Sequence, residues 1–143
     1  MTVKAILSVK GSEVLTIDPT TNLAAAAKLL AERKIGALVV TGADRRVVGI
    51  VSERDIVQEL AAHGAASLDL PLTDVMTRKV STCTMSDTIS SVMERMTEGK
   101  FRHLPVIEQG RLAGIVSIGD VVKHRLQQME QEQSALRDYI QTA

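Results

Sequence analysis

The sequence predicts an α/β (α+β) fold of two pseudo-symmetric β-α-β-β-α repeats packed together, followed by a long C-terminal helix. Two observations predict this fold. The heptapeptide GIVSERD at Gly49–Asp55 returns as GIVSIGD at Gly114–Asp120, with five of seven positions identical. The longer stretches Val14–Val40 and Val80–Val106 align as well, with apolar residues at matching places. Because the same order of signals occurs twice, the repeat describes a structural unit and not one chance motif.

Each repeat is expected to start with a short strand and an amphipathic helix. The strands are expected around Leu15–Ile17 and Ser81–Cys83, and the helices at about Leu23–Glu32 and Ile89–Glu98. In both helices apolar residues recur at i, i+3, i+4 and i+7, the spacing of one helical face. The turns before them are rich in Asp, Ser, Thr and Asn, which are preferred at helix N-caps.

A hairpin and a second helix are expected to complete each repeat. Apolar runs broken at Gly42–Asp44 and at Glu108–Gly110 predict two strands joined by a tight turn in each half. After each GIVS stretch the pattern becomes helical. Gly64 is expected to end the first of these helices, whereas the second is expected to run to about Ile140.

The expected domains are a first repeat with its N-terminal segment at residues 1–64, a connector with the second repeat at 65–126, and a helical extension at 127–143. A half of about 55 residues with three strands is too small to be stable alone, so the halves should share an interface. The segment VMT before the second repeat loosely matches ILS before the first. The connector is therefore expected to be structural and not a flexible linker.

The composition argues against several classes of function. Lys plus Arg and Asp plus Glu each number 17, and the resulting zero net charge argues against a broad nucleic-acid interface. No segment resembles a signal peptide or is long enough to span a membrane, so a cytoplasmic protein without membrane contact is expected. The one cysteine, Cys83, excludes an intrachain disulfide and is expected to be buried. His63 and His124 are expected on the surface, and no metal site is expected because the histidines lack metal-ligand spacing.

The repeated Ser-x-x-Asp has two interpretations. A serine between a strand and a helix can cap the helix, and an aspartate in the first turn interacts favourably with the helix dipole. The same carboxylate can accept hydrogen bonds from the vicinal hydroxyls of a ribose, while free backbone N–H groups beside it attract an anion. The preceding glycines, Gly49 and Gly114, allow close approach of backbone or ligand. The pattern alone leaves both interpretations open.

Two halves that each end in G-h-h-S-x-x-D resemble the paired cystathionine-β-synthase (CBS) domain module, also called a Bateman module, expected here to stand alone. The stretches DVMT and HLPVIEQGRLAGIVSIGDVV are similar to that family's most recognisable lines. The resemblance covers Met1 to about Leu126. It implies two pseudo-symmetric clefts between the repeats that bind adenosine-containing ligands, here AMP, ADP, ATP or NAD(H).

The resemblance also implies which residues line each cleft, because the clefts of the family are built crosswise. In one cleft the ribose residue is Asp55, with Ser52 beside it, and the residues expected from the second half are Val80, Ser81, Thr82, Arg102 and His103. In the other cleft the ribose residue is Asp120, with Ser117 beside it, and the residues expected from the first half are Gly36, Ala37 and the segment before Val14.

The two clefts are not expected to be equivalent. Arg102 and His103 match positions where family members often carry phosphate-binding residues, whereas their counterparts in the first half are small and neutral. Arg54, beside Asp55, is matched by Gly119. The Asp55 cleft is therefore expected to prefer a phosphorylated ligand. The alternative is that both arginines are solvated or ion-paired charges and that His103 is a hydrogen-bonded interior histidine.

The resemblance implies a noncatalytic regulatory module that senses energy or redox state and regulates an unidentified partner protein. No catalytic residue is expected: Ser52, Asp55 and His103 form a conceivable trio, but no Gly-x-Ser-x-Gly elbow or phosphate loop is present. One alternative is a protein-interaction module with vestigial clefts, and another is a cryptic nucleotide-processing enzyme.

The resemblance further implies a homodimer, since modules of the family commonly pair into discs. The terminal helix offers additional contact surface through a partial apolar stripe formed by Val121, Val122, Leu126, Met129, Leu136 and Ile140. The alternative is a helix packed on its own domain.

Overall fold

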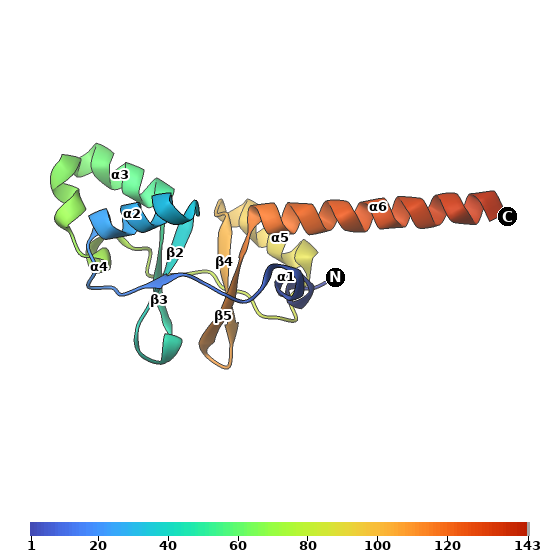
Figure 1. Ribbon diagram of the computed structural model, residues 1–143, viewed down its shortest axis with the longest axis horizontal. Helices are drawn as coiled ribbons and strands as arrows, with labels where there is room; N and C mark the ends of the chain where they lie inside the picture. The colour runs from blue at the N-terminus through green and yellow to red at the C-terminus, as the bar shows by residue number, and fades with distance from the viewer. Residues whose placement is uncertain (143) are drawn as a thin grey trace.

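The computed structural model describes residues 1–142, and the first repeat forms one of its two bodies (Figure 1). Strand β1 (Thr16–Ile17) leads to helix α2 (Leu23–Arg33), to the hairpin of β2 (Ala37–Thr41) and β3 (Val47–Ser52), and to α3 (Glu53–His63). The sheet order is β1-β2-β3, with β1 parallel and β3 antiparallel to β2. A short 3-10 turn (Ala43–Arg45) joins the hairpin, and Gly64 caps α3 as expected.

The second repeat repeats this order with one reduced element. Helix α5 (Ile89–Gly99) precedes the antiparallel pair β4 (His103–Glu108) and β5 (Arg111–Ser117), and α6 (Ile118–Thr142) follows. The strand expected at Ser81–Cys83 is only an isolated parallel bridge between Cys83 and Val106. Cys83 is buried as expected, and burial raises the pKa of its thiol to about 11.

The connector is structured, as expected. It contains a 3-10 helix (Gly64–Asp69) and α4 (Leu72–Val75), and then runs extended beside the first repeat. Thr77 and Ile50 exchange two backbone hydrogen bonds of 2.9 and 3.0 Å. A further helix, α1 (Val3–Lys10), precedes the first repeat and was not expected from the sequence.

The segment before each repeat packs into the core of the other repeat. Helix α1 contributes Val3, Ile6 and Leu7 to the core of the second repeat, whereas Leu72 and Met76 of the connector belong to the core of the first. This exchange ties the two repeats together, and it explains why each half needs its neighbour.

The exchange also accounts for the glycine that begins each GIVS stretch. A Cβ on Gly49 would lie 2.5 Å from Met76 Sδ, and a Cβ on Gly114 would lie 2.7 Å from Leu7 Cδ1. Both glycines therefore make room for a crossing protein segment: the Met76 side chain and the Thr77 carbonyl at Gly49, and the Leu7 side chain at Gly114.

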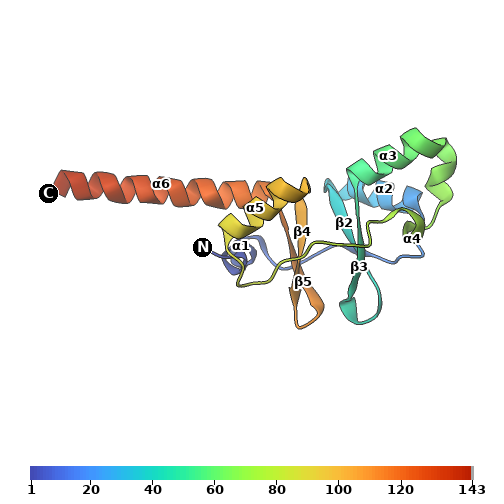
Figure 2. The same ribbon diagram turned by 180° about the vertical axis from the view of Figure 1, so that it is seen from behind.

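Helix α6 begins against the body and then projects beyond it as a single rod, in both views (Figures 1 and 2). Its first turns bury Val121 and His124. The expectation that His124 lies on the surface was wrong, because this part of the helix packs against α5 and α1. Within residues 1–142 no helix combines the length and apolar character needed to cross a membrane.

Candidate functional site

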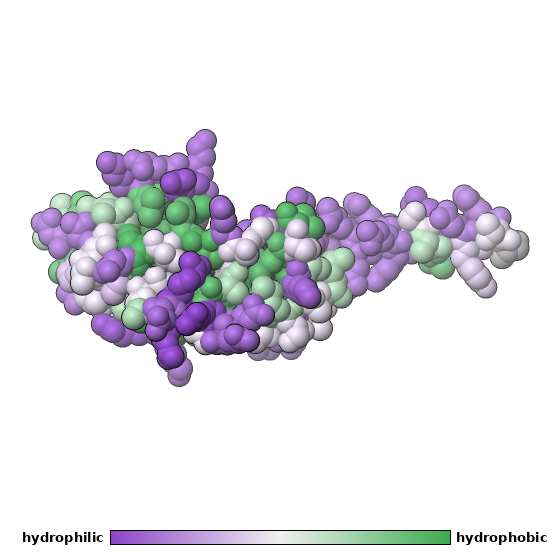
Figure 3. Space-filling model, turned by 60° about the horizontal axis from the view of Figure 1, so that its bottom comes forward, coloured by the Kyte–Doolittle hydropathy of each residue, from purple (hydrophilic) through white to green (hydrophobic). Residues whose placement is uncertain are grey.

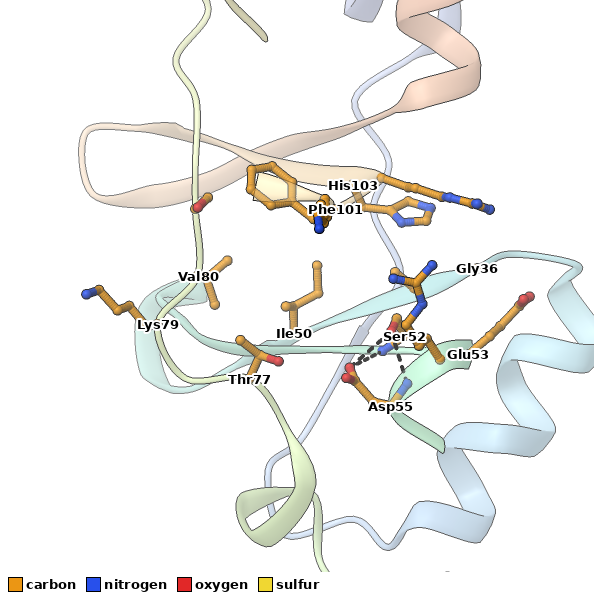
Figure 4. Close-up of a pocket in the computed structure, with 15 residues that line it drawn as sticks. Gly36, Ile50, Ser52, Glu53, Asp55, Thr77, Lys79, Val80, Phe101 and His103 are labelled. Carbon is orange, nitrogen blue, oxygen red and sulfur yellow. Dashed lines mark hydrogen bonds between the residues drawn. The ribbon is translucent and has the colours of Figure 1, made fainter. Parts of the chain in front are cut away.

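A cavity of about 360 Å³ lies between the two repeats (Figure 4). The first repeat supplies Ser52–Asp55 at the junction of β3 and α3, the connector supplies Thr77 and Lys79–Ser81, and the second repeat supplies Lys100–His103. Residues from three separate parts of the chain thus enclose one space. The sequence-predicted residues Ser52, Arg54, Asp55, Val80, Ser81, Arg102 and His103 all line it.

The carboxylate of Asp55 is held by a capping box at the start of α3. Its Oδ2 accepts hydrogen bonds from the backbone N–H of Ser52 (2.8 Å) and from the Ser52 hydroxyl (3.1 Å), and Ser52 Oγ accepts from the Asp55 N–H (3.3 Å). Both interpretations of Ser-x-x-Asp therefore meet in one place: the group that caps the helix also faces the cavity (Figure 4). Among residues 1–142, Asp55 forms no ion pair.

Four cationic side chains surround the same cavity. Arg54 comes from α3, Lys79 from the connector, and Lys100 and Arg102 from the end of α5 and the turn before β4. None of the four forms an ion pair within the described part of the chain. Among residues 1–142, the only carboxylates that line the cavity are those of Glu53 and Asp55, so its charge balance favours an anion.

His103 lies between the cavity and the second Ser-x-x-Asp. Burial lowers the pKa of its imidazole, and the positive charges of Lys10 and Arg102 lower it further against the opposing effect of Glu53 and Asp120. The imidazole is therefore predominantly neutral at neutral pH and can either donate or accept a hydrogen bond.

Gly36 and Ala37 are placed differently from the expectation. They were expected to share a cleft with Asp120, but they line the Asp55 cavity. The reason is that Gly36, just before β2, meets His103, the first residue of β4, across the interface of the repeats. A Cβ on Gly36 would lie 3.1 Å from His103 Cε1, so the glycine makes room for the imidazole.

Thr82 was expected in the Asp55 cleft but does not line that cavity. It lines a smaller hollow of about 280 Å³ together with Arg46, Arg78 and Val80. In an extended segment successive side chains point to opposite sides, and only Val80 borders both spaces. The Thr82 carbonyl oxygen accepts a 2.7 Å hydrogen bond from Arg95, which fixes the segment.

The second Ser-x-x-Asp has the same backbone geometry but a different partner. Asp120 Oδ2 accepts from the Ser117 N–H (2.9 Å), as Asp55 does from Ser52. Lys10, from the segment before Val14, places its Nζ 2.7 Å from the same Oδ2 and donates to the Ile115 carbonyl oxygen at 2.9 Å. The carboxylate of the second Ser-x-x-Asp, Asp120, therefore already has an ion-pair partner, Lys10, from the same chain.

The electrostatics of Asp120 reflect this ion pair. Burial raises the pKa of the carboxyl, but the hydrogen bonds from Lys10 and Ser117 together with the positive charge of Lys10 outweigh burial and hold the pKa below its ordinary value. The carboxylate is ionised and already satisfied at neutral pH.

Several residues of the site were not predicted from the sequence. Ile50, Glu53, Thr77, Lys79, Lys100 and Phe101 line the cavity, and Lys10 reaches the second carboxylate. The two lysines had a signal in the sequence: Lys79 follows VMT and Lys10 follows ILS at the same distance. Across residues 1–142 no three His, Cys, Asp or Glu side chains are grouped to hold a metal ion.

Comparisons by family model, by sequence and by structure all match this chain to CBS-domain proteins. The family model described as "CBS domain" matches the chain twice, at residues 3–62 and 72–127. A relative from Arabidopsis thaliana named "CBS domain-containing protein CBSX3, mitochondrial" is 35% identical over 81% of this chain. The chain spans 58% of that relative and 22% of a second, "CBS domain-containing protein CBSCBSPB5" from the same plant.

Three solved structures are similar in fold. A CBS-domain containing protein from Agrobacterium tumefaciens is 50% identical, with a TM-score of 0.85 over 87% of this chain and 99% of that one. A CBS domain protein from Pyrobaculum aerophilum complexed with AMP is 28% identical, with a TM-score of 0.75 over 84% and 89%. A CBS domain pair in complex with 5′-methylthioadenosine and S-adenosyl-L-methionine is 25% identical, with a TM-score of 0.79 over 90% and 98%.

Proposed function

The chain belongs to the CBS-domain family as a tandem pair of CBS domains, and from this premise we propose that its Asp55 cavity binds a phosphorylated adenosine ligand. The candidates are AMP, ADP, ATP and NAD(H). One observation carries the proposal: the Asp55 carboxylate and four cationic side chains, all without ion-pair partners in residues 1–142, enclose a cavity between the repeats. The structures of relatives with AMP or with S-adenosyl-L-methionine and 5′-methylthioadenosine support an adenosine-type ligand.

Each part of such a ligand has a chemical counterpart in the cavity. Asp55 accepts hydrogen bonds from the two ribose hydroxyls, since a carboxylate is an acceptor-only group with free lone pairs. Ile50 and Val80 face Phe101 across the cavity, and this apolar region receives the adenine ring (Figure 4). Arg54 and Arg102 form charge-assisted hydrogen bonds with the phosphate.

Regulation follows from the position of the cavity between the repeats. A ligand that touches both repeats can favour one relative orientation of the repeats over another. It does so only to the extent that it binds the favoured orientation more tightly. The proposed role is a noncatalytic sensor that passes this change to an unidentified partner protein. The Ser52 hydroxyl donates to the Asp55 carboxylate and accepts from the Asp55 N–H, and this capping role accounts for the serine without a catalytic one.

Isothermal titration with AMP, ADP, ATP, NAD, NADH, S-adenosyl-L-methionine and 5′-methylthioadenosine tests the proposal. The Asp55→Asn variant should bind the preferred ligand at least about tenfold more weakly, because one ribose hydrogen bond to a charged group is lost. The 2′-deoxy form of that ligand should lose less on the same substitution. Asp120→Asn, at the repeat-related position, is the matched control and should bind like the wild type.

The phosphate contacts have a separate test. Arg102→Ala should weaken binding of AMP but leave binding of adenosine unchanged, because only the phosphate loses a partner. If no ligand of the panel binds the wild type, the chain is a protein-interaction module with vestigial clefts. If the preferred ligand is converted to a product during incubation, as seen by chromatography, the noncatalytic role is wrong.

A further inference from the structure

Helix α6 carries an apolar stripe that the body does not cover. Its exposed members are Val122 (41%), Leu126 (55%), Met129 (46%), Leu136 (59%) and Ile140 (64%). Val121, counted with them from the sequence, is fully buried and belongs to the face that packs on the body. The stripe and the body therefore use different faces of one helix, and Figure 3 shows a green patch among purple and white residues on the projecting part.

The spacing of the stripe is that of a coiled coil. Steps of four and three residues alternate from Val122 through Leu126, Met129, Gln133 and Leu136 to Ile140. These residues occupy alternating d and a positions of a heptad, with the polar Gln133 at one a position. We propose that this seam joins two copies of the chain as a parallel, two-stranded coiled coil, a surface separate from the ligand cavity.

The charges beside the seam are complementary between two parallel copies. The g positions hold Arg125 and Glu132, and the e positions one heptad further along hold Glu130 and Arg137. In a parallel pair each g residue faces the following e residue of the other helix. Arg125 then faces Glu130 of the second copy, and Glu132 faces Arg137 of the second copy, so all four contacts of the symmetric pair join opposite charges.

An antiparallel pair does not have this property. When two antiparallel helices are aligned over the whole seam, Glu130 faces Glu130 of the second copy and Glu132 faces Glu132 of the second copy. Like charges at these flanking positions oppose association, and a single polar a residue such as Gln133 further fixes the register. The occupant that fits the seam is therefore a second copy of this chain in parallel orientation.

Analytical ultracentrifugation of the full chain tests the seam. The double variant Met129→Asp with Leu136→Asp should raise the dissociation constant of the dimer at least about 100-fold, because four carboxylates would be buried in the apolar seam. The matched control is Gln131→Asp with Ala135→Asp, which adds the same charges to neighbouring positions outside the seam and should remain a dimer. A monomeric wild type, or equal dimer stability in both variants, would overturn the proposal.

A charge exchange tests the flanking contacts without changing the seam. Glu130→Arg with Glu132→Arg places like charges together in a homodimer, and so does Arg125→Glu with Arg137→Glu. Each variant alone should dimerise more weakly than the wild type, whereas an equal mixture should form a heterodimer at least as stable. Failure of the mixture to associate better than either variant would contradict the assigned pairs.

Orientation has its own readout. Under oxidation, Gln133→Cys should give a disulfide-linked dimer, because equivalent a positions face each other only in a parallel, in-register pair. Ala135→Cys, outside the seam, should cross-link far more slowly, and the wild type should not cross-link because Cys83 is buried. Equal cross-linking at positions 133 and 135 would exclude the parallel arrangement.

Discussion

At the scale of single residues, Lys10 distinguishes the two Ser-x-x-Asp sites more sharply than any other side chain. It forms an ion pair with Asp120, whereas Asp55 has no ion-pair partner among residues 1–142. Its repeat-related residue, Lys79, lines the Asp55 cavity and makes no such contact. The difference arises because helix α1 continues to Lys10, while α4 ends at Val75 and the chain then runs extended.

We expect Lys10→Met to expose a second binding site for adenosine or AMP. The substitution removes the cation from Asp120 Oδ2, which still accepts from the Ser117 N–H, and leaves the carboxylate with free lone pairs for ribose hydroxyls. Isothermal titration should change from one binding event per chain to two, with the new event at least about tenfold tighter than any weak binding of the wild type there. Adding Asp120→Asn to Lys10→Met should remove the second event, and an unchanged single event in Lys10→Met would show that Lys10 does not close this site.

His103 gives the protein a predictable pH dependence. Its pKa is lowered in the folded state, chiefly by burial, so the unfolded chain binds the proton more tightly than the folded one. Stability is therefore lost as pH falls below the ordinary histidine value of about 6.5 towards the folded pKa. Asp120, whose pKa is also lowered, loses its contribution only at far more acidic pH, below the ordinary aspartate range.

His103→Gln should reduce this loss of stability between about pH 7.5 and about pH 5.5. Chemical denaturation of the wild type and the variant at both pH values measures it. The expected result is that the wild type loses more free energy of unfolding than the variant over this window. If the wild type and the variant lose the same free energy of unfolding over this window, His103 binds its proton equally well in the folded and unfolded chains.

At the scale of elements, the two glycines of the GIVS stretches allow a matched comparison. Gly49→Ala would press its Cβ against Met76 and to 3.1 Å from the Thr77 carbonyl oxygen, which is held by its hydrogen bond to Ile50. Gly114→Ala would meet only the end of the Leu7 side chain. We expect Gly49→Ala to cost about 1–3 kcal/mol of stability, and Gly114→Ala to cost less because a side chain moves more easily than a bonded backbone.

Urea denaturation of both variants measures the difference. A larger loss in Gly114→Ala than in Gly49→Ala would mean that the connector shifts more readily than helix α1. Binding of the preferred adenosine ligand, measured in parallel, should weaken in Gly49→Ala, because Thr77 and Lys79 of the same connector line the cavity.

The sequence predicted the local elements well because their signals are local. The periods of α2 and α5, the hairpin turns and the stop at Gly64 all come from neighbouring residues. The capping role of Ser52 and Asp55 was predictable for the same reason. What could not be predicted depends on contacts between distant segments.

Three findings that the sequence did not provide share that cause. His124 sits among polar neighbours in the sequence, yet the packing of α6 on α5 and α1 buries it. Gly36, expected beside Asp120, lines the Asp55 cavity, where its contact with His103 crosses the interface of the repeats. The contact between Lys10 and Asp120 spans 110 residues. The segment before Val14 was expected beside Asp120, but the lysine in it was not singled out.

At the scale of the whole molecule, the exchanged segments and the shared cavity make the two repeats one cooperative unit. Each core contains residues from the segment that precedes the other repeat, and the cavity has walls from both repeats and from the connector. A ligand in the cavity therefore stabilises both repeats at once. At about 100 times its dissociation constant it should raise the free energy of unfolding by about 2.7 kcal/mol.

Hydrogen exchange measured with and without the preferred ligand should reveal this coupling. We expect added protection in β3 and α3 of the first repeat and also in β4 of the second, because their residues meet the ligand from opposite sides. Thermal unfolding should remain a single transition that moves to higher temperature. Asp55→Asn at the same ligand concentration is the control and should show little added protection. Protection confined to the first repeat, or a transition that splits in two when ligand is added, would mean that the repeats unfold independently and that binding in the cavity cannot by itself carry a signal between them.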